Sequence, residues 1–142
     1  MSHRKGASAI EFALWLPVIT TILSGSLDVG WCLWSKQLAV SAAREGARAG
    51  SRVTRDLTQN LPPDAADIET TAETQARNVL VAQGTGCGTD CVVNATWFTD
   101  TVSGFEFVRV TVDFPFDPLV GFIPNLFESI HAEFTSMTLN QV

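Results

Sequence analysis

The feature that most constrains this chain is a long apolar stretch near its N-terminus. From Ala7 to Trp34 the sequence ASAIEFALWLPVITTILSGSLDVGWCLW holds only two charged residues, Glu11 and Asp28. As an α-helix this stretch extends roughly 42 Å, whereas the hydrocarbon layer of a bilayer is about 30 Å thick. A run this long and apolar predicts one membrane-spanning helix, with its span at about residues 10–34.

A secretory signal peptide is the competing interpretation, because Arg4 and Lys5 give the chain a short basic N-terminal region. The apolar core of a signal peptide is only about 7–15 residues long, which is far shorter than this stretch. Positive charge before the helix, and Trp31 and Trp34 at its far end, predict a cytoplasmic N-terminus with the bulk of the chain outside. The arginines that follow Trp34 weaken this charge rule without reversing it.

The charge of the chain is divided unevenly along its length. Residues 1–35 sum to zero, residues 36–55 to +4 and residues 56–142 to −10. After residue 55, Arg77 and Arg109 alone supply positive charge, which is too little to neutralise a series of phosphates. We therefore expect an acidic exported domain that does not bind nucleic acid.

Glu11 is the most informative residue of the apolar stretch, because a carboxylate at membrane depth needs a partner. Two interpretations are open. Glu11 either lies at the cytoplasmic interface and reaches the headgroups, or it pairs with a positive charge on a neighbouring subunit. If the chain is cut after Gly6, Ala7 gains an ammonium group and Glu11 lies about one helical turn further on.

These residues resemble a known family. The segment RKGASAIEFALWLP, followed by SAAREGARAGSR, is similar to the TadE-like pseudopilins (TadE/TadG type) of the tight-adherence (Tad) pilus, a branch of the type IV pilus machinery. The resemblance covers about residues 4–52. It implies that residues 1–6 are a leader removed by a prepilin peptidase between Gly6 and Ala7, with Glu11 as the pilin-type glutamate and Phe12 as its aromatic neighbour.

The resemblance also implies a function and a set of partners. The chain is expected to be a minor pilin (pseudopilin) of the inner, cytoplasmic membrane that takes part in pilus assembly, adhesion or secretion. Its partners are then the membrane, the prepilin peptidase, other pilins or pseudopilins, and the pilus assembly platform. The alternative is an uncleaved anchored protein whose acidic domain recruits an extracytoplasmic partner.

Beyond the membrane span, the helix of residues 7–56 is expected to continue through an alanine-rich extension at 35–56. Four arginines recur along it at helical spacing: Arg44, Arg48, Arg52 and Arg55. This stripe is either a solvated face or a surface that contacts the chain's own acidic domain or a neighbouring subunit. Small residues elsewhere on the extension would let another helix approach closely: Ala39, Ala43, Gly46, Ala47 and Gly50.

The rest of the chain predicts a small exported domain. Residues 57–66 contain Pro62 and Pro63 and form a linker, and the domain follows at 67–142. Asp67 is expected to cap a second helix that runs to about Gln83. Strands are expected at 92–98, 105–114 and 132–139. The predicted fold is α+β and pilin-like, with a long transmembrane helix, a second helix and an antiparallel sheet of about three strands.

Two details of this domain are open. In the last strand a bulge would be needed to turn both Phe134 and Met137 inwards. The apolar loop at 115–127, PFDPLVGFIPNLF, is either a lid on the core or an exposed patch that contacts another subunit or the outer leaflet. Asp28 likewise lies either at the outer interface or against a partner helix.

The remaining chemistry is sparse. Cys87 and Cys91 have a spacing that allows a short-range disulfide in an oxidising compartment, while Cys32 lies in the apolar stretch. His3 and His131 are far from these cysteines in the sequence, so we expect no metal site and no cofactor. No nucleophile motif or phosphate-binding glycine loop is present, and the sequence does not predict an enzyme.

Overall fold

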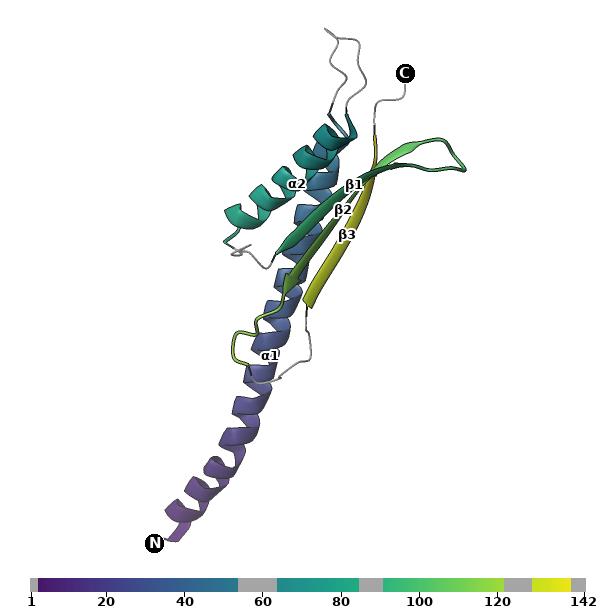
Figure 1. Ribbon diagram of the computed structural model, residues 1–142. Coiled ribbons are helices and arrows are strands. Elements are labelled where there is room, and N and C mark those ends of the chain that lie inside the picture. The colour runs from purple at the N-terminus through teal and green to yellow at the C-terminus, as the bar shows by residue number, and fades with distance from the viewer. Residues whose placement is uncertain (1–2, 54–63, 85–90, 122–128, 139–142) are drawn as a thin grey trace. The chain divides into compact units, whose positions relative to one another are not determined.

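The structure is a computed structural model that describes residues 3–53, 64–84, 91–121 and 129–138. Its elements are α1 (His3–Gly50), α2 (Ala65–Ala82), β1 (Val92–Thr99), β2 (Glu106–Pro115) and β3 (Ser129–Met137) (Figure 1). The predicted α+β fold is confirmed. The chain divides into two units, which are residues 1–33 with 117–126 and residues 34–116 with 127–142.

The helix α1 ends at Gly50, earlier than the expected end near Asp56. Immediately after it, the N–H of Arg52 donates to the carbonyl of Ala49 at 3.1 Å, and the N–H of Val53 donates to the carbonyl of Gly50 at 3.2 Å. Bonds to the third residue back are a common way to close the last turn of a helix. Residues 54–63 lie outside the described part of the chain, so most of the predicted linker is not tested.

The sheet is a simple antiparallel meander of order β1-β2-β3. The β2–β3 register runs without interruption from Phe107 opposite Met137 to Pro115 opposite Ser129. The expected bulge in β3 is therefore wrong. In an unbroken strand Phe134 and Met137 point to opposite faces, and Met137 is 46% exposed. The strand also begins at Ser129, three residues before the expected start.

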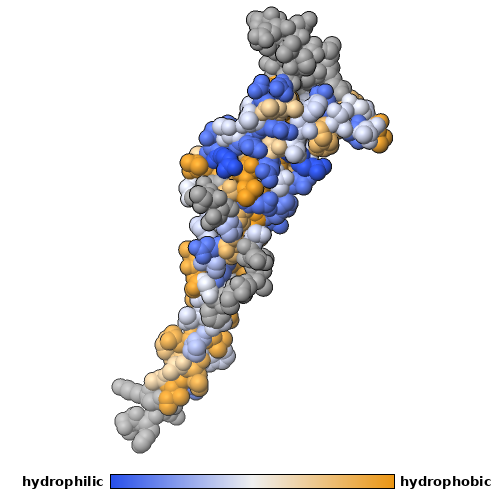
Figure 2. Space-filling model, in the orientation of Figure 1, coloured by the Kyte–Doolittle hydropathy of each residue, from blue (hydrophilic) through white to orange (hydrophobic). Residues whose placement is uncertain are grey.

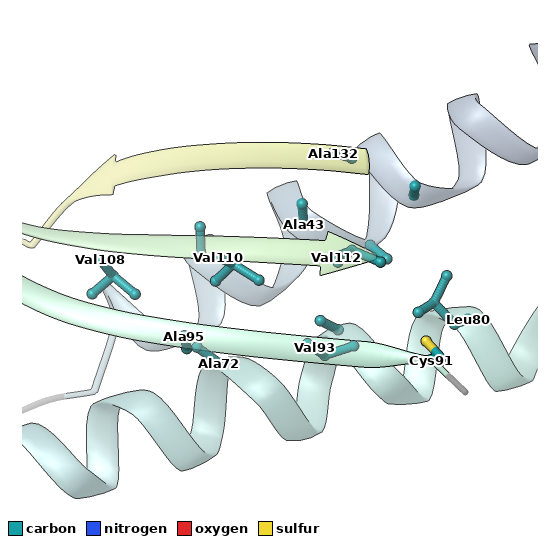
Figure 3. Close-up of a cluster of buried hydrophobic side chains, with 14 of the residues drawn as sticks. Ala43, Ala72, Leu80, Cys91, Val93, Ala95, Val108, Val110, Val112 and Ala132 are labelled. Atoms are coloured by element: carbon teal, nitrogen blue, oxygen red, sulfur yellow. The ribbon is translucent and has the colours of Figure 1, made fainter. Parts of the chain in front are cut away.

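Both helices pack on one face of this sheet (Figure 3). β2 contributes a row of fully buried valines, Val108, Val110 and Val112. The buried residues of α2 form one apolar stripe: Ile68, Ala72, Ala76 and Leu80. The part of α1 in this core contributes mostly methyl groups: Ala39, Ala42, Ala43 and Ala47. Side chains this short allow the backbone of α1 to lie close to its neighbours.

The closest approach to α1 is at its two glycines. A Cβ atom built on Gly46 would lie 2.7 Å from the carbonyl oxygen of Ala72 and 2.9 Å from the Cβ of Ala76. A Cβ atom on Gly50 would lie 2.9 Å from the Cβ of Ala72. The small residues of α1 were predicted to admit another helix, and in this structure α2 of the same chain occupies that position.

The N-terminus of α2 is capped by a different aspartate from the expected one. Asp64 has an extended backbone, and its side chain accepts a hydrogen bond from the N–H of Ala66 at 3.4 Å. The prediction of Asp67 as the cap is wrong, because Asp67 lies in the first helical turn. Its negative charge still stabilises this end of the helix through the helix dipole.

The turn between β1 and β2 is organised by Asp100. Its carboxylate accepts hydrogen bonds from the hydroxyl and N–H of Ser103 and from the N–H of Val102. These bonds, the Ser103 hydroxyl first, lower the pKa of Asp100 from its ordinary value of 3.8. The turn is thus stabilised by the carboxylate form, and this contribution is lost as the pH falls through the lowered pKa.

The outer edge of β1 is covered by two carboxylates of α2. The N–H of Ala95 donates to Glu73 Oε1 at 3.1 Å, and the N–H of Trp97 donates to Glu69 Oε1 at 2.9 Å. β1 is an edge strand, and an edge strand presents unpaired N–H groups to which another chain can add a strand. Glu69 and Glu73 lie one helical turn apart, so they satisfy alternate N–H groups of β1.

We expect the double variant Glu69→Ala/Glu73→Ala to lower the free energy of unfolding by about 1–3 kcal/mol, because two partly buried N–H groups lose their acceptors. Denaturant unfolding in mild detergent, followed by circular dichroism, measures the change. The matched control is Glu69→Gln/Glu73→Gln, which keeps an acceptor oxygen at each position. Equal stability of the alanine and glutamine variants would show that these hydrogen bonds do not stabilise the sheet.

Candidate functional site

The apolar part of α1 is exposed on all sides from Ala9 to Leu23. Figure 2 shows hydrophobic residues over this part of the helix, and its most apolar window is not buried by the rest of the chain. The exposed large side chains include Ile10, Phe12, Leu14, Trp15, Leu16, Val18, Ile19, Ile22, Leu23, Leu27, Val29, Trp31 and Leu33. A helix that is hydrophobic all round is buried in a core or spans a membrane. α1 is long and apolar enough to cross a bilayer, and it fits a membrane anchor.

Three hydroxyl groups of this segment bond to the helix itself. Thr20, Thr21 and Ser26 each donate to the carbonyl oxygen four residues back, at 2.8 Å. Such bonds keep hydroxyl groups satisfied where no water is available. The helix is continuous through Pro17, although a proline lacks the N–H that would bond to the preceding turn. These polar side chains are therefore compatible with a lipid environment.

The residues predicted for processing and charge pairing lie near the start of α1. Gly6 and Ala7 are helical, since α1 begins at His3. Glu11 and Phe12 follow, both with exposed side chains, and Phe12 is 66% exposed. Among the described residues, no hydrogen bond or ion pair joins Glu11 to another side chain. If Glu11 lies at membrane depth, it needs a partner that the described part of the chain does not supply.

Asp28 is placed in an unexpected way. It is 4% exposed, and one of its carboxylate oxygens accepts a hydrogen bond from the N–H of Val120 at 2.8 Å. Cys32, one turn further along α1, is a buried free thiol. The two interpretations considered for Asp28 were the interface and a partner helix. Its observed contact is a loop that lies 92 residues away in the sequence, which no local pattern could predict.

That loop belongs to the apolar segment 115–127, of which residues 115–121 are described. Phe116 packs against the core, as the lid interpretation requires. Leu119 and Val120 are instead 61% and 48% exposed, as the patch interpretation requires. The segment therefore divides between the two expected roles, and its remaining residues lie outside the described part of the chain.

The arginine stripe has mixed surroundings. The guanidinium of Arg44 lies 5.6 Å from the ring centroid of Phe134, in a cation–π contact with the chain's own sheet. Arg48 lies 3.9 Å from Glu45, and both side chains are well exposed. Arg52 is exposed, and Arg55 lies outside the described residues. Arg48 and Arg52 thus remain available at the surface of the helix extension.

Charged residues also pair across the sheet face opposite the helices. Asp113 Oδ1 contacts His131 Nδ1, because the β2–β3 register places these residues opposite each other. Arg109 Nε lies 3.0 Å from Glu133 Oε1, and its guanidinium lies 4.9 Å from the ring centroid of Phe98. The partner of His131 was not found from the sequence, because the pair depends on strand register.

The predicted disulfide is not tested. Cys91 is buried at the start of the sheet, at 6% exposure, whereas Cys87 lies outside the described residues. The pairing of Cys87 with Cys91 stays a prediction. Within the described ranges, His, Cys, Asp and Glu side chains form no group of three that could hold a metal ion.

The family model described as TadE-like protein matches residues 6–48. This N-terminal segment, which is less than half of the chain, is similar to the TadE-like family. The TadE-like match includes the exposed apolar helix and most of the alanine face that packs in the core, and it ends two residues before α1 does. No curated protein and no solved structure matches the chain. The TadE-like family suggests a protein associated with the Tad pilus.

Proposed function

We propose that this TadE-like protein is a minor pilin that is processed by a prepilin peptidase and assembles with other pilins. The observation that carries the proposal is the family match beginning at Gly6, directly before an exposed apolar helix. The leader of residues 1–6 stays in the cytoplasm, α1 crosses the inner membrane, and the acidic domain lies outside. The protein acts by assembly and not by catalysis.

The proposed mechanism pairs the new N-terminus at Ala7 with the carboxylate of Glu11. Cutting between Gly6 and Ala7 creates an ammonium group in an apolar setting, where an unpaired charge is costly. Glu11 is exposed on the same helix, and a neighbouring subunit's ammonium group can approach it in the low-dielectric space between helices. Each new subunit thereby contributes one positive and one negative charge. Phe12 provides apolar contact beside this pair.

The helix extension supplies a second contact surface in this proposal. Arg48 and Arg52 are exposed, whereas residues 56–142 carry a net charge of −10. Arginines on one subunit and carboxylates on the next attract each other and set the orientation of approach. Exposed pairs of this kind contribute little affinity each, about 0–1 kcal/mol, so their role is alignment.

Cleavage of the leader is the decisive test. Co-expressed with its prepilin peptidase, the protein is expected to begin at Ala7 by intact-mass spectrometry, and Gly6→Leu is expected to abolish cleavage. The matched control is Gly25→Leu, a replacement on the same helix at a position with open space around it, which should leave cleavage unchanged. An intact leader on the unaltered protein would overturn the minor-pilin proposal and favour an uncleaved anchored accessory protein.

A further inference from the structure

The loop at residues 117–121 is attached to the apolar part of α1. The N–H of Val120 donates to Asp28 at 2.8 Å, and both residues belong to the same unit of the structure. A carboxylate that accepts a backbone N–H forms a charge-assisted bond, which is stronger than a neutral one. The bond fixes this loop at the height of Asp28 along the helix.

The position of Asp28 relative to the bilayer follows from the geometry of a helix. Asp28 comes seventeen residues after Glu11, which corresponds to roughly 25 Å along the axis, and the hydrocarbon layer is about 30 Å thick. With Glu11 at the cytoplasmic boundary, Asp28 lies just inside the outer boundary. Trp31 and Trp34 follow it within two turns, where aromatic residues gather at membrane interfaces.

The loop presents apolar side chains at this depth. Leu119 is 61% exposed and Val120 is 48% exposed, beside a helix whose own Leu27 is 55% exposed. Exposed apolar groups at the level of the hydrocarbon continue the lipid-facing surface of the helix. The bond to Val120 also explains how a carboxylate can be kept at this depth, since Asp28 is shielded at 4% exposure.

We propose that residues 117–121 form a second membrane contact, with Leu119 and Val120 inserted in the outer leaflet and Asp28 holding the loop there. This inference rests on the proposed membrane anchor. Leu119 and Val120 contact lipid in this proposal, because they continue the lipid-facing surface of α1. The chain thus meets the bilayer at two segments that are far apart in sequence.

The test places a fluorescent label at Leu119. In a Cys32→Ala background, Leu119→Cys carries an environment-sensitive nitrobenzoxadiazole group, and the full chain is reconstituted in nanodiscs of phosphatidylethanolamine and phosphatidylglycerol. The background variant must take up no label; if Cys87 or Cys91 reacts, both are replaced by alanine. The label is expected to emit at shorter wavelength, to resist quenching by iodide, and to be quenched by nitroxide-bearing lipid.

Two reference labels separate this inference from the anchor on which it rests. Ile19→Cys reports the middle of the apolar helix, and Val102→Cys reports a polar hairpin turn where the side chain is 93% exposed. Protection at Ile19 with iodide quenching at Leu119 equal to that at Val102 overturns the loop contact alone. Iodide quenching at Ile19 would overturn the anchor itself.

The role of Asp28 is tested in the same labelled protein. Asp28→Leu removes the acceptor for the N–H of Val120, so the Leu119 label should become accessible to iodide. Asp28→Asn keeps an acceptor oxygen and should retain the protection. If the label is quenched by a nitroxide on a second copy of the chain, and not by nitroxide-bearing lipid, the patch contacts protein and the lipid proposal is wrong.

Discussion

Replacing Gly46 with alanine is expected to destabilise the protein, although alanine normally strengthens a helix by about 1 kcal/mol relative to glycine. The new methyl group would lie 2.7 Å from the backbone oxygen of Ala72. A backbone atom inside a helix cannot rotate away, so α1 and α2 would have to separate. Overpacking of this kind typically costs about 1–3 kcal/mol, and Gly46→Leu should cost more than Gly46→Ala.

The matched control for this experiment is Gly25→Ala, because a Cβ atom at Gly25 meets nothing within 4 Å. The free energy of unfolding, measured by denaturant titration in mild detergent, should fall for the Gly46 variants and stay level or rise for the control. Equal stability of Gly46→Ala and Gly25→Ala would mean that the helices are not in close contact at this point.

The second large effect is expected at Glu11. Glu11→Ala should be cut normally after Gly6 but should not enter a fibre, because the ammonium group of the neighbouring subunit would be left without its partner. Removing one member of a desolvated charge pair costs about 3–5 kcal/mol, and about 1.4 kcal/mol changes an equilibrium tenfold. Incorporation should therefore fall more than about a hundredfold.

The measurement compares the sheared fibre fraction with the membrane fraction by immunoblot, and mass spectrometry of the N-terminus checks processing. Glu45→Ala is the control, because Glu45 is an exposed carboxylate on the same helix whose contact with Arg48 is long, at 3.9 Å. This variant should assemble like the unaltered protein. Normal assembly of Glu11→Ala would remove the charge-pair role, whatever the fate of the leader.

Periodicity in the sequence was a reliable guide to the elements of the fold. The apolar stretch predicted the anchor helix. The second helix and the first two strands were predicted to within about two residues of the bounds of α2, β1 and β2. These patterns are local, because they follow from how often a helix or a strand presents the same face.

The errors arose where local rules allow more than one answer. Asp64 and Asp67 are both suitable N-caps, and the choice depends on which backbone is extended. Gly50 ends α1 although the arginine spacing continues past it at Arg52 and Arg55. In β3 the hydrophobic residues Phe134 and Met137 were both assigned to the core, whereas an unbroken register sends Met137 to the other face.

The contacts most relevant to function depend on residues that are distant in the sequence. Asp28 meets Val120, and Glu69 and Glu73 meet the edge of β1, only after the chain has folded. A sequence shows that a carboxylate in an apolar helix needs a partner, but it does not show which backbone N–H supplies it. Glu11 is a different case, because its proposed partner belongs to another subunit.

The alanine and glycine face of α1 determines which kinds of domain can pack on this helix. From Ala39 to Gly50 this face is occupied by the protein's own second helix and sheet, so it is not available to a neighbour. The family match covers the anchor together with most of this face and ends at residue 48. A face of this kind can accept any small domain that presents a flat apolar surface to its methyl groups, and the apolar part of α1 need not change.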